Sequence, residues 1–251
     1  SGWSGYVIDA AIVTHPDDDH IGGFVHILED LQAGKLYDIC FNCFWVNDPT
    51  KHEFVPNDVQ RIQTQKSLDA RLKCVYNYKE DSKKNLLDLI DSAGIARTEV
   101  FAGDYLDEPQ ITIISPTRDF YESLLPKFRN KLNFHWALEA LEENSYSSKD
   151  DISDETTLSK TLDDATDDTS AHNQSSIVFL LETDEKQKFL FTGDAGRDAF
   201  NHVPQTLLGK VKDVTWMKVP HHGSKHNLDS TIIKHVNPEI AYISTEKQGK
   251  Y

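Results

Sequence analysis

The chain has 251 residues, of which 38% are hydrophobic, and a formal net charge of −15 at pH 7. This length allows one large domain or two small ones around a sizeable buried core. The longest apolar stretches, between residues 177 and 191, fall well short of the roughly 18 residues that a membrane span needs, so we expect no membrane segment in this chain. Three cysteines are too few for the disulfide framework of a small secreted domain, which favours a reducing, cytoplasmic location.

The negative charge also bears on possible partners. It argues against a broad basic surface that would bind a phosphate backbone by counterion release. Residues 142–171 hold ten acidic and two basic residues, a net charge of −8, so the rest of the chain keeps −7 of the total of −15. A nucleic-acid substrate would therefore have to be bound by local patches or by metal ions.

Apolar spacing predicts strands and helices that alternate along the chain. Residues 6–14 are β-branched and apolar and end directly at His15, which is typical of a buried strand that leads into a functional loop. After the Gly-Gly pair at 22–23, helical spacing predicts a helix over 24–32. Further strands are expected at 35–45, 110–115, 176–182, 188–192, 214–219 and 240–244. Further helices are expected at 57–71, 82–93, 195–208 and 227–235, and one long helix or a helix pair at 118–143.

This pattern favours an α/β (α+β) fold in a single domain over residues 1–251, with helices packed outside the sheets. Residues 35–145 are interpreted as an inserted or elaborated region of that domain. Residues 144–171 are rich in Ser, Thr, Asp and Glu with almost no apolar anchor, so burial cannot offset the entropy cost of ordering them. We expect a flexible acidic loop there.

The strongest motif is Thr-His-Pro-Asp-Asp-Asp-His-Ile-Gly-Gly at residues 14–23. Two imidazoles and three carboxylates within six residues would repel and desolvate one another unless a cation held them together. Imidazole nitrogen and carboxylate oxygen suit zinc, manganese or iron, and such a mixed set can bridge two ions. The alternative is a solvated acidic loop with two incidental histidines, which its position after a buried strand disfavours.

Two further clusters each follow a predicted strand. Phe-Thr-Gly-Asp-Ala-Gly at 191–196 places Asp194 between glycines, where backbone can approach closely. Val-Pro-His-His-Gly-Ser at 219–224 supplies the adjacent histidines His221 and His222. A Gly-Asp-Ala-Gly segment alone is most often only a turn. Three such clusters at strand ends in one chain are much harder to attribute to chance.

In this order, the three motifs resemble those of the metallo-β-lactamase superfamily, and most of all its ComEC-like competence nuclease branch. The resemblance covers residues 6–30 and 172–244. It implies an αββα sandwich, with two mixed β-sheets, helices on the outer faces and two metals at the sheet edge. Relatives begin and end with further elements, so the resemblance also implies a fold incomplete at both ends and a chain that is part of a larger protein.

The resemblance assigns a metal role to seven residues. His15 and Asp17 would bind the first metal, with Asp17 at a position where many relatives have histidine. Asp19 and His20 would serve the second. Asp194 matches the carboxylate that bridges both ions, and His222 matches the last ligand. The seventh is His172, which lies four residues before Ser176, the spacing of the family's third histidine, although the branch often has asparagine-rich sequence there.

The implied activity is metal-dependent hydrolysis by a hydroxide that two divalent ions activate, with zinc or manganese favoured and magnesium possible. Asp19 would orient that hydroxide. His221, Ser224 or Lys225 would donate to the phosphate or to the leaving oxygen, and His221 has the further alternatives of orienting or replacing His222. The favoured substrate is a phosphodiester in DNA, in competence or in defence against phage, with other domains or subunits as partners.

Two other functions stay open at this point. The fold hosts many chemistries, so a lactone, thioester or β-lactam could be the substrate. A binding or regulatory module that has lost catalysis is the third interpretation, and the near-complete ligand set argues against it. Cys40 and Cys43 form a C-x-x-C without a second pair, and we interpret them as ordinary buried residues rather than as a zinc or redox site.

Overall fold

The computed structural model describes residues 5–52, 68–79, 81–129 and 162–245. Over these residues the chain is a mixed α/β structure with several sheets and helices. A small sheet contains β1 (Tyr6–Ile12), β2 (Ile39–Trp45) and β5 (Ala96–Thr98), in the order β1-β2-β5. Its three strands are parallel.

A larger sheet has the strand order β11-β10-β9-β8-β7-β6. Its strands are β6 (Tyr105–Leu106), β7 (Gln110–Ser115), β8 (Val178–Glu182), β9 (Lys188–Phe191), β10 (Trp216–Lys218) and β11 (Ile240–Tyr242). Neighbouring strands from β6 to β9 are antiparallel, whereas β9, β10 and β11 run parallel. A short antiparallel pair, β3 (Asn77–Tyr78) and β4 (Asp81–Asn85), stands apart from both sheets.

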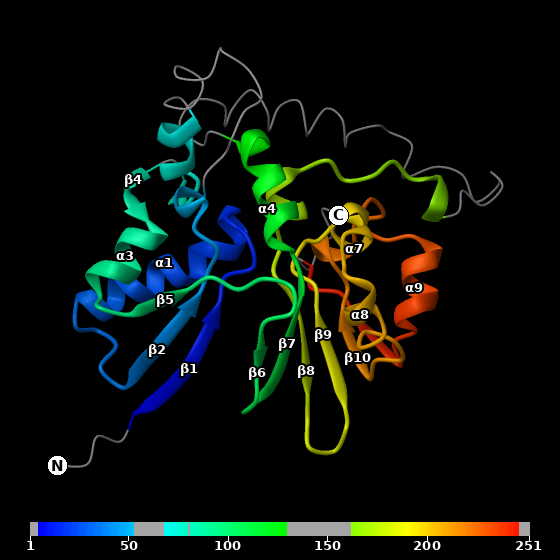
Figure 1. The fold of residues 1–251 in the computed structure, drawn as a ribbon. Helices are drawn as coiled ribbons and strands as arrows, with labels where there is room; N and C mark the ends of the chain where they lie inside the picture. The colour runs from blue at the N-terminus through cyan, green and yellow to red at the C-terminus, as the bar shows by residue number, and fades with distance from the viewer. Residues whose placement is uncertain (1–4, 53–67, 80, 130–161, 246–251) are drawn as a thin grey trace.

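Helices cover the outer sides of the two sheets (Figure 1). The helices are α1 (Asp18–Gln32), α3 (Leu86–Ser92), α4 (Arg118–Leu124), α6 (Ala171–Gln174), α7 (Arg197–Asn201), α8 (Gln205–Leu208) and α9 (Ser230–Val236). In Figure 1, α1 and α3 flank the small sheet on one side, and α7, α8 and α9 flank the larger sheet on the other. The two sheets therefore lie between two groups of helices.

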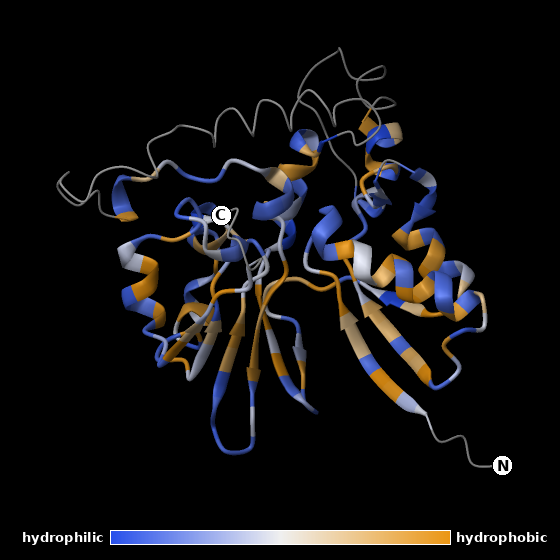
Figure 2. Cartoon of the chain, turned by 180° about the vertical axis from the view of Figure 1, so that it is seen from behind, coloured by the Kyte–Doolittle hydropathy of each residue, from blue (hydrophilic) through white to orange (hydrophobic). Residues whose placement is uncertain are grey.

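The two sheets contact each other through a small apolar core. Ile12 and Trp45 of the small sheet pack against a cluster that includes Ile111 and Ile113 of β7, with Phe179 of β8 beside them. Figure 2 shows hydrophobic residues along the strands of both sheets, whereas the turn between β8 and β9 is hydrophilic. These contacts bring the carboxyl ends of β1 and β9 toward the same part of the molecule.

The expected mixture of strands and helices is confirmed, but the small sheet is wholly parallel over its described strands rather than mixed. The strand at 110–115 and the hairpin at 176–192 form as predicted. Helix α1 starts at Asp18, whereas the sequence predicted a start at 24. Gly22 and Gly23 thus lie inside the helix, and a Cβ on Gly22 would come within 2.6 Å of the Tyr78 ring.

Three predicted helices are shorter than expected. The 82–93 helix begins only at Leu86, because Asn85 caps α3 by accepting from the amides of Leu87 and Asp88. The 118–143 helix ends at Leu124, followed by a 3₁₀ turn that contains Pro126, and residues beyond 129 lie outside the described part until 162. The 195–208 helix divides into α7 and α8 before Pro204, which cannot donate an interior helical hydrogen bond.

Other expectations fall partly on residues that the structure does not describe. Residues 68–71, the end of the predicted 57–71 helix, are helical and the helix continues to residue 73, whereas residues 57–67 lie outside the described residues. So do residues 144–161 of the predicted acidic loop. Residues 162–170 are described, and there Arg197 donates to the carbonyls of Leu162 and Ala165. The flexibility of the loop stays a prediction. Within the described ranges, the helices all lack the length or apolarity needed to cross a membrane.

The cysteine expectation is also corrected. Cys40 is exposed and Cys43 is only half-buried, so neither is an ordinary buried residue. Both lie on β2, where residues three apart point to opposite faces of the sheet. The C-x-x-C spacing therefore does not bring the two sulfur atoms to one site.

Candidate metal centre

The three sequence motifs meet where strands of both sheets end. His15 and Asp17 lie in the loop after β1, and Asp194 follows β9. His221 and His222 follow β10, the parallel neighbour of β9. The amide of Ile177 donates to the carbonyl of Thr14 at 2.9 Å, which joins the loop after β1 to the residue before β8. Carboxyl ends of parallel strands are the usual place for ligand sites in α/β proteins.

Four of the predicted ligands form a compact group, called here the His/Asp group. Its donor atoms all lie within 4.8 Å of one another, and its members are Asp19, His20, Asp194 and His222. His20 Nε2 lies 3.2 Å from Asp194 Oδ1. His222 Nε2 lies 3.0 Å from Asp19 Oδ2 and 3.7 Å from Asp194 Oδ2. This spacing is small enough for one cation to contact all four side chains.

His15 approaches the same Asp194 from another side. Its Nε2 lies 3.9 Å from Asp194 Oδ2 and 3.8 Å from Asp17 Oδ2. Asp194 is buried, with 4% of its side chain exposed, and it faces this histidine as well as the other members of the His/Asp group. Both oxygens of this carboxylate thus face histidine Nε2 atoms, Oδ1 that of His20 and Oδ2 those of His15 and His222.

The histidine rings are oriented from their Nδ1 side. His20 Nδ1 lies 3.1 Å from Thr14 Oγ1, and His15 Nδ1 lies 3.1 Å from the same hydroxyl and 3.2 Å from Ser176 Oγ. His222 Nδ1 lies 2.6 Å from the carbonyl of Ser244. Each ring thus presents Nε2 to the carboxylates. Second partners of this kind are how proteins set the tautomer and direction of metal-binding histidines.

Three buried atoms at the centre lack hydrogen bonds within the described part of the chain. They are His15 Nε2, His20 Nε2 and Asp194 Oδ1. Buried polar atoms are nearly always satisfied, so an orphaned cluster needs an explanation. Bound divalent cations would satisfy such atoms, because imidazole Nε2 and carboxylate oxygen are their ordinary ligands. The residues present therefore fit a metal site.

Protonation in the centre suits metal binding. Burial, together with the nearby His20, lowers the pKa of His15 to about 4. Burial alone would raise the pKa of Asp194, but His20 and His15 outweigh it and hold that pKa below its usual value. At neutral pH the centre thus offers a neutral His15 and an ionised Asp194. Metal ligands must be in these states.

Two turns at the centre adopt left-handed backbone conformations. Gly193 has a φ of 54°, and a Cβ there would lie 3.0 Å from side-chain atoms of Thr14 and Ser176. His221 and His222 have φ values of 44° and 53°, which non-glycine residues rarely adopt. Such strain persists only where surrounding contacts enforce it, and it is concentrated at functional sites.

His172 is close to the centre but contacts Asp17 rather than Asp194. Its Nδ1 lies 2.7 Å from Asp17 Oδ1, and its Nε2 accepts from the amide of Arg129 at 3.2 Å. Burial would raise the pKa of Asp17, yet the contact with His172 lowers it well below its usual range. With partners at both ring nitrogens, His172 orients Asp17 in this structure. A direct metal contact by His172 stays a prediction.

The predicted proton donors are placed differently from one another. His221 is half-buried beside the centre, with its Nδ1 3.3 Å from Asp168 Oδ2. Ser224 Oγ accepts from the amide of His226 at 3.3 Å, so its hydroxyl oxygen supports the turn. Lys225 is exposed. Of these three, His221 is the one that the structure ties closely to the metal-site turns.

Sequence reasoning missed Lys218, in the last position of β10. Its Nζ donates to the carbonyl of Gly193 at 2.9 Å and lies 3.7 Å from Asp194 Oδ1. Burial lowers the pKa of Lys218, although Asp194 opposes that change. Its place three residues before His221, at the end of a predicted strand, is the signal that could have marked it. Sequence reasoning also missed Ser176 and Asp168 as contacts of the site, because only folding brings them to it.

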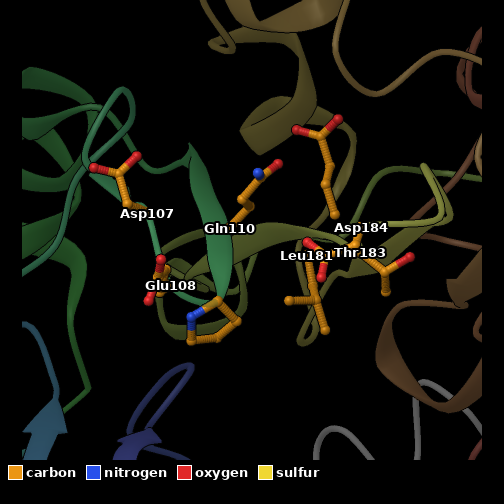
Figure 3. Close-up of a pocket in the computed structure, with 8 residues that line it drawn as sticks. Asp107, Glu108, Gln110, Leu181, Thr183 and Asp184 are labelled. Atoms are coloured by element: carbon orange, nitrogen blue, oxygen red, sulfur yellow. The ribbon is translucent and has the colours of Figure 1, made fainter.

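A wide cavity elsewhere lacks comparable chemistry. It has a volume of about 600 Å³ and is lined by the β6–β7 turn and the end of β8, with Asp107, Glu108, Glu182 and Asp184 among its residues (Figure 3). It lies at the opposite end of β8 from Ser176. Its lining has four carboxylates and no histidine or cationic residue, so the His/Asp group, with its mixed donors, is the better candidate for a metal centre.

Comparison with known proteins adds no identification. No family model matches the chain, and a search of curated proteins found no match.

Proposed function

We propose that this chain is a metal-dependent hydrolase of the metallo-β-lactamase fold that cuts a phosphodiester bond in nucleic acid. The observation that carries the proposal is the convergence of three imidazole Nε2 atoms, from His15, His20 and His222, on the buried Asp194. The two-sheet arrangement with helices outside is compatible with that fold.

Two divalent ions would be held around Asp194. His15 and Asp17 would bind one, and Asp19, His20 and His222 would bind the other, with Asp194 shared between them. When bound, the ions would lower the pKa of a shared water and neutralise charge on the attacked group. Zinc and manganese suit this ligand set best, and magnesium, which prefers oxygen ligands, is the third choice.

The chain's own residues would orient the reactants. Asp19 has 53% of its side chain exposed, so it can meet both solvent and substrate while its Oδ2 stays within 3.0 Å of His222. Lys218 holds the turn that carries Asp194 through the carbonyl of Gly193. His221 borders the same site, where it can contact the leaving oxygen of a bound substrate.

Two positively charged side chains near the centre favour an anionic substrate. Lys218 Nζ lies 3.7 Å from Asp194 Oδ1, and Arg129 Nη2 lies 3.8 Å from Asp17 Oδ2. In a chain of net charge −15 they are the local positive groups that a phosphate would need. Hydrolysis of a small lactone, thioester or β-lactam is the second candidate, and a non-catalytic binding module is the third.

The test is cleavage of plasmid and single-stranded DNA with added manganese, zinc or magnesium. We compare the native chain with Asp19→Ala and His222→Ala, and use His26→Ala as the matched control because its side chain is 59% exposed on α1. Metal-dependent cutting that is lost in both site variants and kept in the control supports the proposal. Bound metal without cutting under any condition would refute the nuclease assignment and favour a small-molecule substrate.

A further inference from the structure

The acidic segment 162–170 packs beside the turn that carries His221 and His222. Arg197 donates to the carbonyl of Leu162 at 3.0 Å and to that of Ala165 at 3.2 Å. The amide of Asp168 donates to the carbonyl of His226 at 3.0 Å. These contacts place a segment that precedes β8 against Arg197, which follows β9, and His226, which follows β10.

Asp168 is the residue of this segment that reaches the site. Only 6% of its side chain is exposed, whereas its neighbour Asp167 has 60% exposed. Its carboxylate accepts from the amide of Ser170 at 2.8 Å and from the Nδ2 atoms of Asn173 and Asn227 at 2.8 and 2.9 Å. Burying a carboxylate costs free energy unless hydrogen bonds satisfy it. These hydrogen bonds therefore hold Asp168 in place inside the protein rather than in solvent.

The same carboxylate orients His221. Two oxygen atoms face His221 Nδ1, namely Asp168 Oδ2 at 3.3 Å and Asn227 Oδ1 at 3.1 Å. A donor, Asn173 Nδ2, lies farther from the same nitrogen at 3.4 Å, so the two closer acceptors favour a proton on Nδ1. Asn227 also donates to the carbonyl of Asp194 at 3.0 Å, which connects this contact to the turn of the shared carboxylate.

The anchored ring lies next to a strained metal ligand. His221 and His222 both have left-handed φ values, and His222 directs Nε2 to Asp19 and Asp194. The turn is fixed on one side by the contact of His222 Nδ1 with Ser244 and on the other by the contact of His221 with Asp168. Loss of either contact would let the strained backbone relax and move His222.

We propose that Asp168 is a positioning residue of the metal centre: through His221, it holds the strained turn that directs His222 toward Asp19 and Asp194. This inference rests on the proposed function, since it takes the His/Asp group to be a metal site. It assigns a role to a segment whose composition predicted only a flexible loop.

The test measures metal affinity of the full chain by competition with a chromogenic chelator, with manganese and zinc as probes. In Asp168→Asn, one amide oxygen must replace two carboxylate oxygens that serve four donors, so we expect affinity to fall about 10-fold. Asp164→Asn, which removes an equal charge from an exposed position in the same segment, should leave affinity unchanged.

A double-mutant cycle separates positioning from general structural damage. If Asp168 acts through His221, Asp168→Asn should cause no further loss of affinity in a His221→Phe background. Additive losses, or native affinity in Asp168→Asn, would overturn the inference.

Failure of the proposed function can be distinguished from failure of this inference. If the native chain binds no metal, that proposal falls, and histidine ¹⁵N spectra of the metal-free protein decide the inference. A changed His221 Nδ1 signal in Asp168→Asn supports positioning, and unchanged spectra refute it.

Discussion

The hydroxyl of Thr14 offers the sharpest test of how the candidate metal centre is built. Its Oγ1 lies 3.1 Å from Nδ1 of both His15 and His20. For Nε2 to bind a metal, the Nδ1 atom of a neutral imidazole must carry the proton and needs an acceptor. His15 has a second partner in Ser176 Oγ, whereas Thr14 is the hydrogen-bond partner that the structure shows for His20 Nδ1. Thr14→Val keeps the shape of the side chain and removes that acceptor.

We expect the free-energy cost of Thr14→Val mainly when metal binds. In the metal-free protein, His20 can move its proton to Nε2, which lies 3.2 Å from Asp194 Oδ1. Metal binding forces the proton back to Nδ1, where the valine leaves it unsatisfied at a cost of about 1–3 kcal/mol. Since 1.4 kcal/mol is a factor of about 10, metal affinity should fall roughly 5- to 150-fold.

The assay is chelator competition, with elemental analysis of the purified protein and circular dichroism to check folding. Thr14→Ser is the matched control, since it keeps the hydroxyl and should bind metal within about threefold of the native chain. Ser176→Ala should have a smaller effect than Thr14→Val, because His15 keeps its contact with Thr14. Native affinity in Thr14→Val, or an equal loss in Thr14→Ser, would show that this hydroxyl does not set the imidazole protons.

Two further predictions concern stability. Gly23 lies on the exposed side of α1 with open space where a Cβ would be, so the higher helix propensity of Gly23→Ala should raise the melting temperature by about 2–4 °C. Gly22→Ala must displace the Tyr78 ring and should lower the melting temperature. Equal shifts of the two variants in thermal unfolding would contradict this reasoning. The buried His52 lies 2.9 Å from a glutamate oxygen at each ring nitrogen, and these hydrogen bonds outweigh burial and raise its pKa above 6.5. Its stabilisation is therefore complete below pH 6.5 and lost as pH rises through the folded pKa. His52→Gln should flatten the decline in melting temperature above pH 6.5, and an unchanged slope would refute the role.

The buried ion-pair cluster around His52 also shows what sequence inspection overlooked. His52 has no recognisable motif, yet its side chain is 1% exposed and contacts Glu99 and Glu122, which lie far away in the chain. The predictions for helices failed for a related reason. Asn85 sets the start of α3 by capping it, and Pro204 divides a helix because it lacks a donor, and apolar spacing over a window registers neither effect.

The sequence by itself determined the parts of this protein that depend on near neighbours in the chain. The apolar run at 6–14, the cluster at 15–20 and the glycines beside Asp194 are local patterns, and they predicted strand ends that carry imidazoles and carboxylates. The tertiary structure decided which side chains meet. Ser176, Lys218 and Asp168 reach the site only because β1, β9 and β10 end together, and the contact of His172 with Asp17 depends on packing across 155 residues of chain. Hydrogen bonds and packing contacts between such distant residues leave no periodic pattern in the sequence. Their partners can therefore be identified only in the folded chain.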